Sequence, residues 1–169
     1  MTRSGRALNL PGDSPLSRAA AQSPALVIFL RSFGCTFCRE AMDDVSRLQK
    51  EIRAAGAGIV FVHGATAEEA APWFSKYELD NVTVISDPDL AHYRAFGLGR
   101  TRVTDMVAPK VWKRGAQSAL AHGFGTQTIE MMRQLPGVFV VQAGEVLAEY
   151  RHQSPADRPD YLSLIRSTM

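Results

Sequence analysis

The segment from residue 26 to residue 56 constrains this chain most strongly, because it places two cysteines between a predicted strand and a predicted helix. The strand is an unbroken apolar run from Leu26 to Leu30, which is typical of a strand buried on both faces. Cys35 and Cys38 follow it, and they are the only cysteines in the chain. The residues after them have the apolar spacing of an amphipathic helix. The apolar positions of this helix are Ala41, Met42, Val45, Leu48 and Ile52.

The position of the cysteines at the start of a helix has a chemical consequence. A thiol there faces unpaired backbone N–H groups and the positive end of the helix dipole, and both favour the thiolate. The thiolate is the nucleophilic form of cysteine. Cys38 lies one turn after Cys35, within reach for a disulfide. The spacing therefore predicts a redox pair at an accessible rim of the molecule, with one sulfur that attacks and a second that resolves the product.

Buried structural cysteines and metal ligation are the alternative interpretations of this pair. Structural zinc requires four ligands, and the sequence has no second CxxC motif. Haem attachment requires a histidine directly after the second cysteine, where Arg39 stands. We therefore expect no metal and no cofactor, although a zinc site shared across a dimer stays open. The four histidines are scattered singly, at His63, His92, His122 and His152.

Length and composition predict one globular domain over residues 1–169, whose first fourteen residues, 1–14, form a polar N-terminal arm. The formal charge of +2 argues against a nucleic-acid partner. The N-terminal arm has no apolar core of a secretory signal, and the run 25–30 is too short to cross a membrane. We therefore expect a cytoplasmic protein with no membrane partner, and a symmetric homodimer is the expectation from base rates. In a reducing cytosol a CxxC pair is more often catalytic than structural.

The rest of the chain predicts strands and helices in alternation, which is typical of a three-layer α/β domain. Thr66 and Glu69 have capping-box spacing, and Asp87 before Pro88 has the pattern of a helix start. The predicted strands are an extended piece at 7–10, runs at 59–62 and 82–85, and a hairpin at 138–141 and 146–150. The predicted helices begin at residue 15, run from 66 to 77 and from 87 to 97, and close the chain within 154–169. The run 59–62 is expected to be parallel to the first strand through a right-handed crossover.

Residues 98–135 interrupt this alternation before the hairpin. They carry several glycines, a basic cluster and weak periodicity, so we interpret them as an insertion with short helical pieces at 107–112 and 128–133. The basic cluster is interpreted as a solvated face. A loop of this length is often a lid or a binding element, so it is a candidate for substrate contact.

Three stretches of the sequence resemble the thioredoxin-like superfamily, and within it the peroxiredoxin-like branch of AhpC/TSA type that includes peroxiredoxin-like 2. They are FLRSFGCTFCRE at 29–40, ISDPDLAHYRAFGL at 85–98 and LPGVFVVQAGEVLAEYRH at 135–152. The resemblance implies a thioredoxin-like three-layer α/β fold, with a central mixed sheet flanked by helices and an insertion before the final hairpin.

The resemblance also assigns roles to residues around the pair. It makes Cys35 the peroxidatic cysteine and Cys38 the resolving one. Ser32 matches the hydroxyl residue that supports the reactive sulfur, although a simple turn residue is an equal interpretation. Pro136 falls where these folds place a cis-proline against the redox pair. Phe33 and Leu135, each close to one of these positions, are the predicted substrate contacts.

The sequence departs from the peroxiredoxin pattern in two places that bear on chemistry. The family has a proline seven residues before the cysteine, and here that residue is Ile28. The family also has an arginine immediately before the hairpin strand, and here Pro136 and Gly137 stand at that position. The missing cation then has three candidates, Arg31, Arg39 and Arg133, and nothing in the sequence selects one of them. Arg39, next to Cys38, is a predicted supporting residue of the pair. His63, which ends a predicted strand, is interpreted as a packed residue.

The predicted function is a thiol-dependent redox enzyme that reduces peroxides through a Cys35–Cys38 disulfide. An external thiol such as thioredoxin or glutathione would reset the pair. Two alternatives stay open at this point: a disulfide oxidoreductase of thioredoxin type, and a redox sensor or binding module without turnover.

Overall fold

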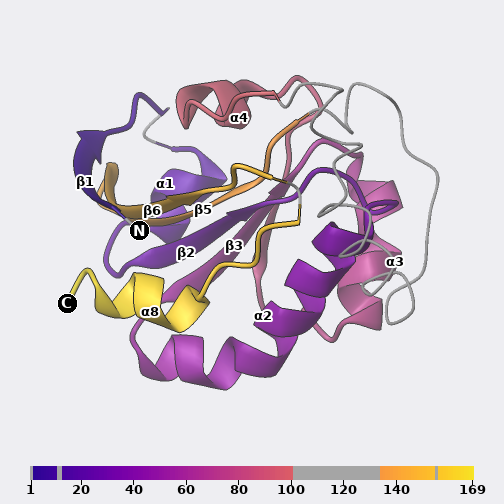
Figure 1. Cartoon of the computed structure of the whole chain (residues 1–169), viewed down its shortest axis with the longest axis horizontal. Helices are drawn as coiled ribbons and strands as arrows, with labels where there is room; N and C mark the ends of the chain where they lie inside the picture. The colour runs from indigo at the N-terminus through magenta and orange to yellow at the C-terminus, as the bar shows by residue number, and fades with distance from the viewer. Residues whose placement is uncertain (1, 11–12, 101–133, 155) are drawn as a thin grey trace.

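The fold is a six-stranded mixed sheet with helices on both faces (Figure 1). The computed structural model describes residues 2–10, 13–100, 134–154 and 156–169. The predicted helical pieces at 107–112 and 128–133, and Arg133, lie outside these residues. The strands are β1 (Thr2–Ala7), β2 (Ala25–Phe29), β3 (Gly58–His63), β4 (Thr83–Ser86), β5 (Gly137–Gln142) and β6 (Glu145–Arg151). The helices are α1 (Pro15–Ala19), α2 (Thr36–Ala54), α3 (Ala67–Lys76), α4 (Ala91–Ala95) and α8 (Tyr161–Arg166).

The sheet has the order β1-β6-β5-β2-β3-β4. Strand β2 is parallel to β3 and antiparallel to β5, so it lies inside the sheet with a partner on each side. Because β2 is covered by helices on both faces as well, all five of its residues are buried. This position explains the unbroken apolar run from Leu26, and it confirms the predicted α/β class with a central mixed sheet.

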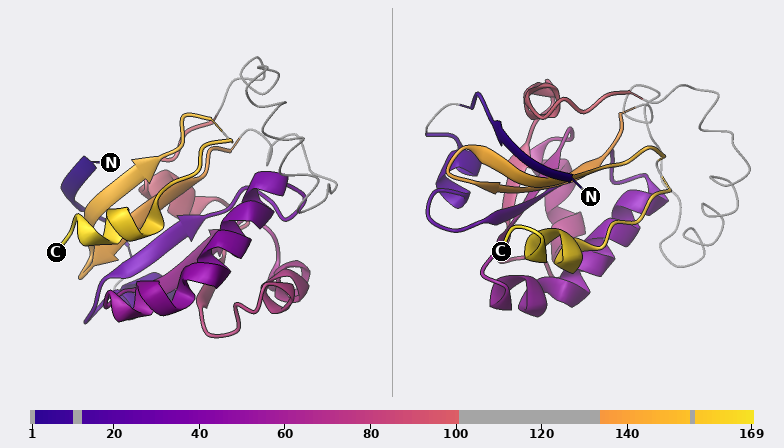
Figure 2. Two further views of the ribbon diagram at one scale, coloured as in Figure 1. Left: turned by 60° about the horizontal axis from the view of Figure 1, so that its bottom comes forward. Right: turned by 60° about the vertical axis from the view of Figure 1, so that its left-hand side comes forward.

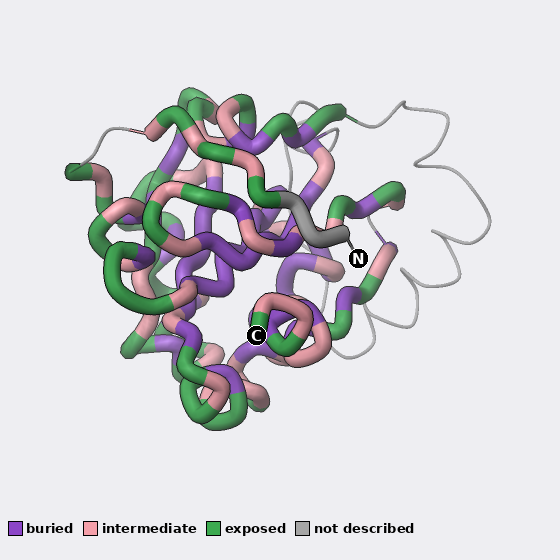
Figure 3. Tube along the Cα trace, turned by 90° about the vertical axis from the view of Figure 1, so that its left-hand side faces the viewer, coloured by how far each residue is buried: buried purple, intermediate pink, exposed green. Residues whose placement is uncertain are grey.

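The alternation of side chains along β2 divides the interior into two cores. Leu26 and Ile28 point to the face covered by α2, α3 and α8, while Val27 and Phe29 point to the face covered by α1 and α4. Figure 2 shows the sheet between these two helical layers, and Figure 3 shows the buried residues concentrated along its central strands. Among the described residues, none of the helices has the length and apolarity to cross a bilayer.

Two predicted elements begin elsewhere in the structure. The extended piece expected at 7–10 is wrong: β1 covers Thr2–Ala7 and pairs antiparallel with β6, because that pairing outweighs its polar sequence. The helix expected from Asp87 begins instead at Ala91. Asp87 lies before this helix and caps it, since its two carboxylate oxygens accept hydrogen bonds from the backbone N–H groups of Ala91 (3.0 Å) and His92 (2.8 Å) in the first turn.

Tyr93 connects α4 to the end of the sheet where the cysteine loop, residues 31–34, begins. Its ring is 1% exposed and its hydroxyl donates toward the carbonyls of Leu30 and Val62, the latter at 3.2 Å. The backbone N–H of Leu30 bonds the same Val62 carbonyl at 2.9 Å. A buried hydroxyl from the opposite core therefore holds the residue that directly precedes the cysteine loop.

Replacing Tyr93 by Phe should lower the free energy of unfolding by about 1 to 2 kcal/mol, because buried carbonyls lose a donor without a change in packing volume. Urea denaturation measures this difference. The control is Tyr150→Phe, a partly exposed tyrosine of β6, which should cost less than half as much. Equal losses in the two variants would contradict a special role for the Tyr93 hydroxyl.

Candidate active site

The cysteine pair lies where the chain leaves β2 and enters α2. Cys35 is the N-cap residue of α2, with extended backbone angles, and its carbonyl accepts from the N–H groups of Cys38 and Arg39, both at 3.1 Å. Its own N–H donates to the carbonyl of Ser32 at 3.1 Å, which closes the loop that leads into the helix. The sulfur of Cys35 therefore lies among the first N–H groups of α2, as the sequence predicted.

The two thiols lie side by side and share one neighbour, Arg31. The thiols are hydrogen-bonded to each other, and the backbone N–H of Arg31 donates to Cys38 Sγ at 3.1 Å. The guanidinium of Arg31 reaches Cys35 Sγ, with an Nη1–Sγ distance of 3.9 Å. One residue thus contacts both sulfurs, through its backbone and through its side chain.

These contacts separate the acidities of the two thiols. The hydrogen bond from Cys38 lowers the pKa of Cys35 to about 6; the charge of Arg31 and the N–H groups of Cys38 and Phe37 act in the same direction, and burial opposes them. The pKa of Cys38 is raised well above its usual value, first by burial and then by its bond to Cys35. Near neutral pH the pair therefore holds a thiolate at Cys35 and a thiol at Cys38.

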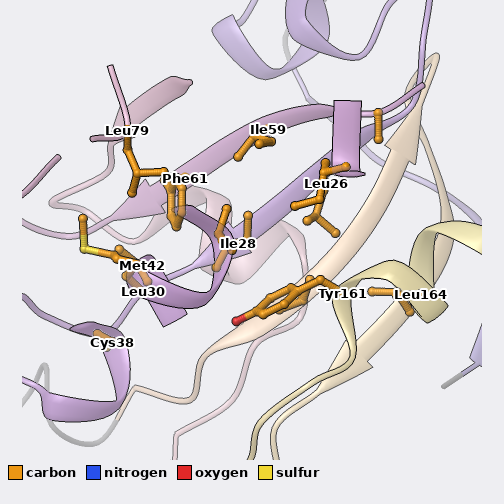
Figure 4. Packing of buried hydrophobic residues seen from close by; sticks show 14 of the residues in the cluster. Leu26, Ile28, Leu30, Cys38, Met42, Ile59, Phe61, Leu79, Tyr161 and Leu164 are labelled. Atoms are coloured by element: carbon orange, nitrogen blue, oxygen red, sulfur yellow. The ribbon is translucent and has the colours of Figure 1, made fainter. Parts of the chain in front are cut away.

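The pair is buried, and the expectation of an accessible rim is wrong. Cys35 and Cys38 are each 3% exposed and belong to the core that Leu30, Phe33 and Met42 share. Figure 4 shows Cys38 beside Leu30 and Met42 at one end of this core. The burial follows from the loop, because residues 31–34 fold over the helix start.

Phe33 belongs to the same buried core as the pair. Its ring is stacked on Trp73 with an interplanar angle of 4° and meets Phe74 edge-on with ring centroids 5.9 Å apart. His63 is 1% exposed and packs against the same ring, with centroids 5.1 Å apart, and burial lowers the pKa of this histidine. Phe33 has a packing role in this structure, and its predicted contact with substrate stays a prediction.

Of the three candidate cations, Arg31 is the one beside the reactive sulfur. Arg39 Nε donates to the carbonyl of Phe33 at 2.6 Å, and its guanidinium lies 4.3 Å from the centre of the Trp73 ring. Arg39 therefore supports the loop that carries Phe33. The two arginines are both buried, and the fold of this short loop decides which of them faces Cys35.

The remaining predicted residues surround the pair less directly. The hydroxyl of Ser32 is buried without a hydrogen-bond partner among the described residues, so the expected bond to the reactive sulfur is not formed. The resemblance places a cis-proline at Pro136, but no described peptide bond is cis, so the chain differs here from that pattern. Leu135 donates its N–H to the carbonyl of Gly99 at 3.0 Å, and its predicted contact with substrate stays a prediction.

Beside the pair, a cleft leads from the surface to Cys38; we call it the Cys38 cleft. Its floor is formed by Cys38, Pro136, Val138, His152 and Tyr161, all buried, and its rim includes Phe37, Asp44, Asp157 and Arg158. Sequence reasoning missed the floor residues after the hairpin. The predicted hairpin was the one available signal for His152. Its two strands are antiparallel and pair Gly137 with Arg151, so the next residue, His152, lies level with Pro136.

His152 is neutral at physiological pH. Burial lowers its pKa to about 4, against the opposing effect of Asp157 and of backbone contacts at Asp157 and Pro136. Its Nδ1 atom is buried without a hydrogen-bond partner among the described residues. Within the described part of the chain, no three His, Cys, Asp or Glu side chains gather in a way that could hold a metal ion.

Comparison with known proteins relates the chain to thiol antioxidant enzymes. The profile of the family described as AhpC/TSA antioxidant enzyme matches residues 44–154, a segment that begins after the cysteine pair. The prostamide/prostaglandin F synthase of Danio rerio is 27% identical over 143 residues, which cover 82% of this chain and 70% of that protein.

Solved peroxiredoxin structures share the fold. A reduced peroxiredoxin of Vibrio vulnificus superposes with a TM-score of 0.65 at 15% identity, over 100% of this chain and 97% of that one. Peroxiredoxin Q of Xanthomonas campestris gives a TM-score of 0.63 at 19% identity, over 90% of this chain and 81% of that one. At these identities the likeness shows the thioredoxin-like fold alone, and the predicted fold is confirmed.

The thiolate at Cys35 should depend on Arg31. Arg31→Met should raise the pKa of Cys35 from about 6 by one unit or more, because a nearby positive charge is removed. Ultraviolet absorbance of the thiolate, followed through a pH titration of the reduced protein, measures this pKa. The control is Arg39→Met, which removes an equally buried guanidinium and should leave the pKa nearer to about 6. A larger change in the control would show that Arg39 is the cation after all.

Burial of neutral His152 should make stability depend on pH. Between about pH 6.5 and about pH 4 the unfolded chain binds a proton at this residue that the folded chain does not, so the free energy of unfolding should fall as the pH falls. The contribution is at most about 1.4 kcal/mol per pH unit. Urea denaturation across this range should show a shallower dependence for His152→Gln than for the wild type. Identical slopes would contradict the assignment.

Proposed function

The chain belongs to the AhpC/TSA antioxidant enzyme family, and on that premise we propose that it is a thiol peroxidase that uses Cys35 as its nucleophile and Cys38 as its resolving cysteine. The observation that carries the proposal is the contact of Arg31 with both sulfurs of the pair at the start of α2. Cys35 has a pKa lowered to about 6 at the start of α2, with Arg31 Nη1 at 3.9 Å and the thiol of Cys38 as a hydrogen-bond donor.

The peroxidatic step begins with the Cys35 thiolate. Its sulfur attacks one oxygen of the peroxide, the O–O bond breaks, and the other oxygen leaves with the electron pair and takes a proton as an alcohol or water. Cys35 is left as a sulfenic acid. Arg31 is placed to stabilise the negative charge that moves from sulfur to oxygen.

The resolving step uses the neighbouring thiol. Cys38 loses its proton, its sulfur bonds to the Cys35 sulfur, and the sulfenic oxygen leaves as water. Two equivalents of an external thiol then return the pair to the dithiol state and become a disulfide themselves. The hydrogen bond between the two thiols supports this sequence, because the resolving sulfur needs no large movement to reach Cys35.

Burial favours a small substrate over a protein disulfide. With each cysteine 3% exposed, a two-atom peroxide group reaches the pair more easily than a disulfide held on a folded protein. A similar Xanthomonas campestris protein is described by its alkyl peroxide reduction activity, so an organic hydroperoxide belongs in the substrate panel beside hydrogen peroxide.

Stopped-flow oxidation of the reduced protein by hydrogen peroxide and by an organic hydroperoxide tests the proposal, with Trp fluorescence as the signal. The second-order rate constant should rise with pH through about 6 and level off above, because it follows the fraction of Cys35 thiolate. Cys35→Ser should abolish the reaction. Cys38→Ser should retain the first oxidation and accumulate a sulfenic acid that dimedone labels.

The same variants separate the competing functions. Peroxide consumption by Cys35→Ser at the wild-type rate would refute the peroxidase. Reduction of insulin disulfides without peroxide turnover would point to a disulfide oxidoreductase. Oxidation without turnover, for any donor, would leave a redox sensor.

A further inference from the structure

The Cys38 cleft offers access to only one sulfur of the pair. Of the two described thiols, Cys38 lines the cleft and Cys35 does not. Cys38 lies on the buried floor together with Pro136 and His152, while Arg158 on the rim has a side chain that is 52% exposed. A molecule that enters from solvent along this rim therefore meets the sulfur of Cys38 first.

The chemistry of thiol–disulfide exchange selects the same sulfur. When an external thiolate attacks a Cys35–Cys38 disulfide, the sulfur that is not attacked must leave with the electron pair. Exchange is faster when the leaving thiol has the lower pKa and when the attacked sulfur is accessible. Cys35 is the better leaving group, because Arg31 and the N–H groups of the helix start stabilise its thiolate. Access and leaving-group stability thus both direct the attack to Cys38.

The charge of the cleft limits which thiols enter it. Arg158 bonds Asp44 through Nε at 2.8 Å and reaches Glu40 through Nη1 at 3.6 Å, so its charge is already shared between two carboxylates of α2. With Asp157, the lining of the cleft holds three carboxylates against the two guanidinium groups of Arg31 and Arg158. The histidine of the lining, His152, is neutral. An anionic molecule is therefore repelled at the rim.

We propose that the Cys38 cleft is the binding site of the thiol that regenerates the enzyme, that this donor attacks Cys38, and that donors carrying a neutral or positive group beside the thiol are preferred over anionic ones. The inference rests on the proposed function and adds the site and the class of the donor. It places glutathione, whose carboxylates outnumber its ammonium group, among the poorer donors.

The reaction balances over two steps. The donor sulfur bonds to Cys38, the bond between Cys38 and Cys35 breaks, and its electron pair leaves on the Cys35 thiolate. A second donor thiolate then attacks the donor sulfur of this mixed disulfide, and Cys38 leaves with the electron pair and takes a proton. Two donor thiols are oxidised to one disulfide, and the two cysteines are reduced.

The first test identifies the attacked sulfur. The full chain is oxidised with diamide, mixed briefly with 2-mercaptoethanol and quenched in acid, after which the free thiol is alkylated and mapped by peptide mass spectrometry. We expect the donor on Cys38 and the alkyl group on Cys35; the reverse distribution overturns the inference and leaves the peroxidase proposal standing. Failure of diamide to form any Cys35–Cys38 disulfide overturns both.

The second test measures the charge preference with three small donors of similar size. Cysteamine, 2-mercaptoethanol and 3-mercaptopropionate carry a positive, neutral and negative group, and we expect their rate constants, corrected for thiolate fraction, to fall in that order. Arg158→Gln should deepen the disadvantage of mercaptopropionate relative to mercaptoethanol by about twofold to fivefold, the size expected of an exposed charge. A fastest rate for mercaptopropionate overturns the inference.

Arg47→Gln is the matched control, because it removes an arginine of the same helix layer that pairs with Asp43 and does not line the cleft. It should leave the ratio of the two rates unchanged. The rate with neutral mercaptoethanol reports whether each variant keeps its fold around the pair. Equal ratios in Arg158→Gln and Arg47→Gln would show that the rim does not select the donor, and would overturn the charge preference.

Discussion

The contact of Arg31 with two sulfurs is the interaction on which the rest of the site depends. Its backbone N–H bonds Cys38 Sγ and its guanidinium reaches Cys35 Sγ. A buried arginine and a buried thiolate are each costly alone, since both lose the solvation that water provides, and together they offset much of that cost. Arg31 is 4% exposed, so its charge depends on a partner inside the protein. The hydrogen bond from Cys38 is the first cause of the lowered pKa of Cys35, and the charge of Arg31 adds to it.

The fold holds this pairing through elements that contribute no chemistry. Strand β2 is paired on both sides and covered on both faces, so the loop that leaves it begins from a fixed point. Tyr93 reaches from the opposite core to the carbonyl of Leu30, the residue before Arg31. On the other side Arg39 holds the carbonyl of Phe33, whose ring is packed among aromatic residues of α3 and β3. The loop between Leu30 and Cys35 is thus fixed at both ends.

Burial shapes the proposed chemistry as much as charge does. The aromatic packing of Phe33 buries the loop before the pair, and the Cys38 cleft opens toward solvent. In the proposed cycle a small peroxide reacts with Cys35, whereas the larger thiol donor reacts with Cys38. Cys35 supplies the nucleophile and the leaving group, whereas Cys38 supplies the point of attack. Such a division needs two cysteines whose pKa values differ. The hydrogen bond between the thiols lowers the pKa of Cys35 and raises that of Cys38, and burial raises the pKa of Cys38 further.

The sequence by itself determined the strand, the cysteine-bearing helix start, the parallel and hairpin strands and the thioredoxin-like frame, because each leaves a periodic pattern or a short motif within a few neighbouring residues. Only the tertiary structure decided that Arg31 rather than Arg39 faces Cys35, since that choice depends on the packing of Phe33 against Trp73, forty residues away in the chain. It also decided the burial of the pair and placed Arg158 beside α2, although Arg158 is 114 residues from Asp44 in the chain. Contacts of this separation follow from how layers pack, and no local pattern records them.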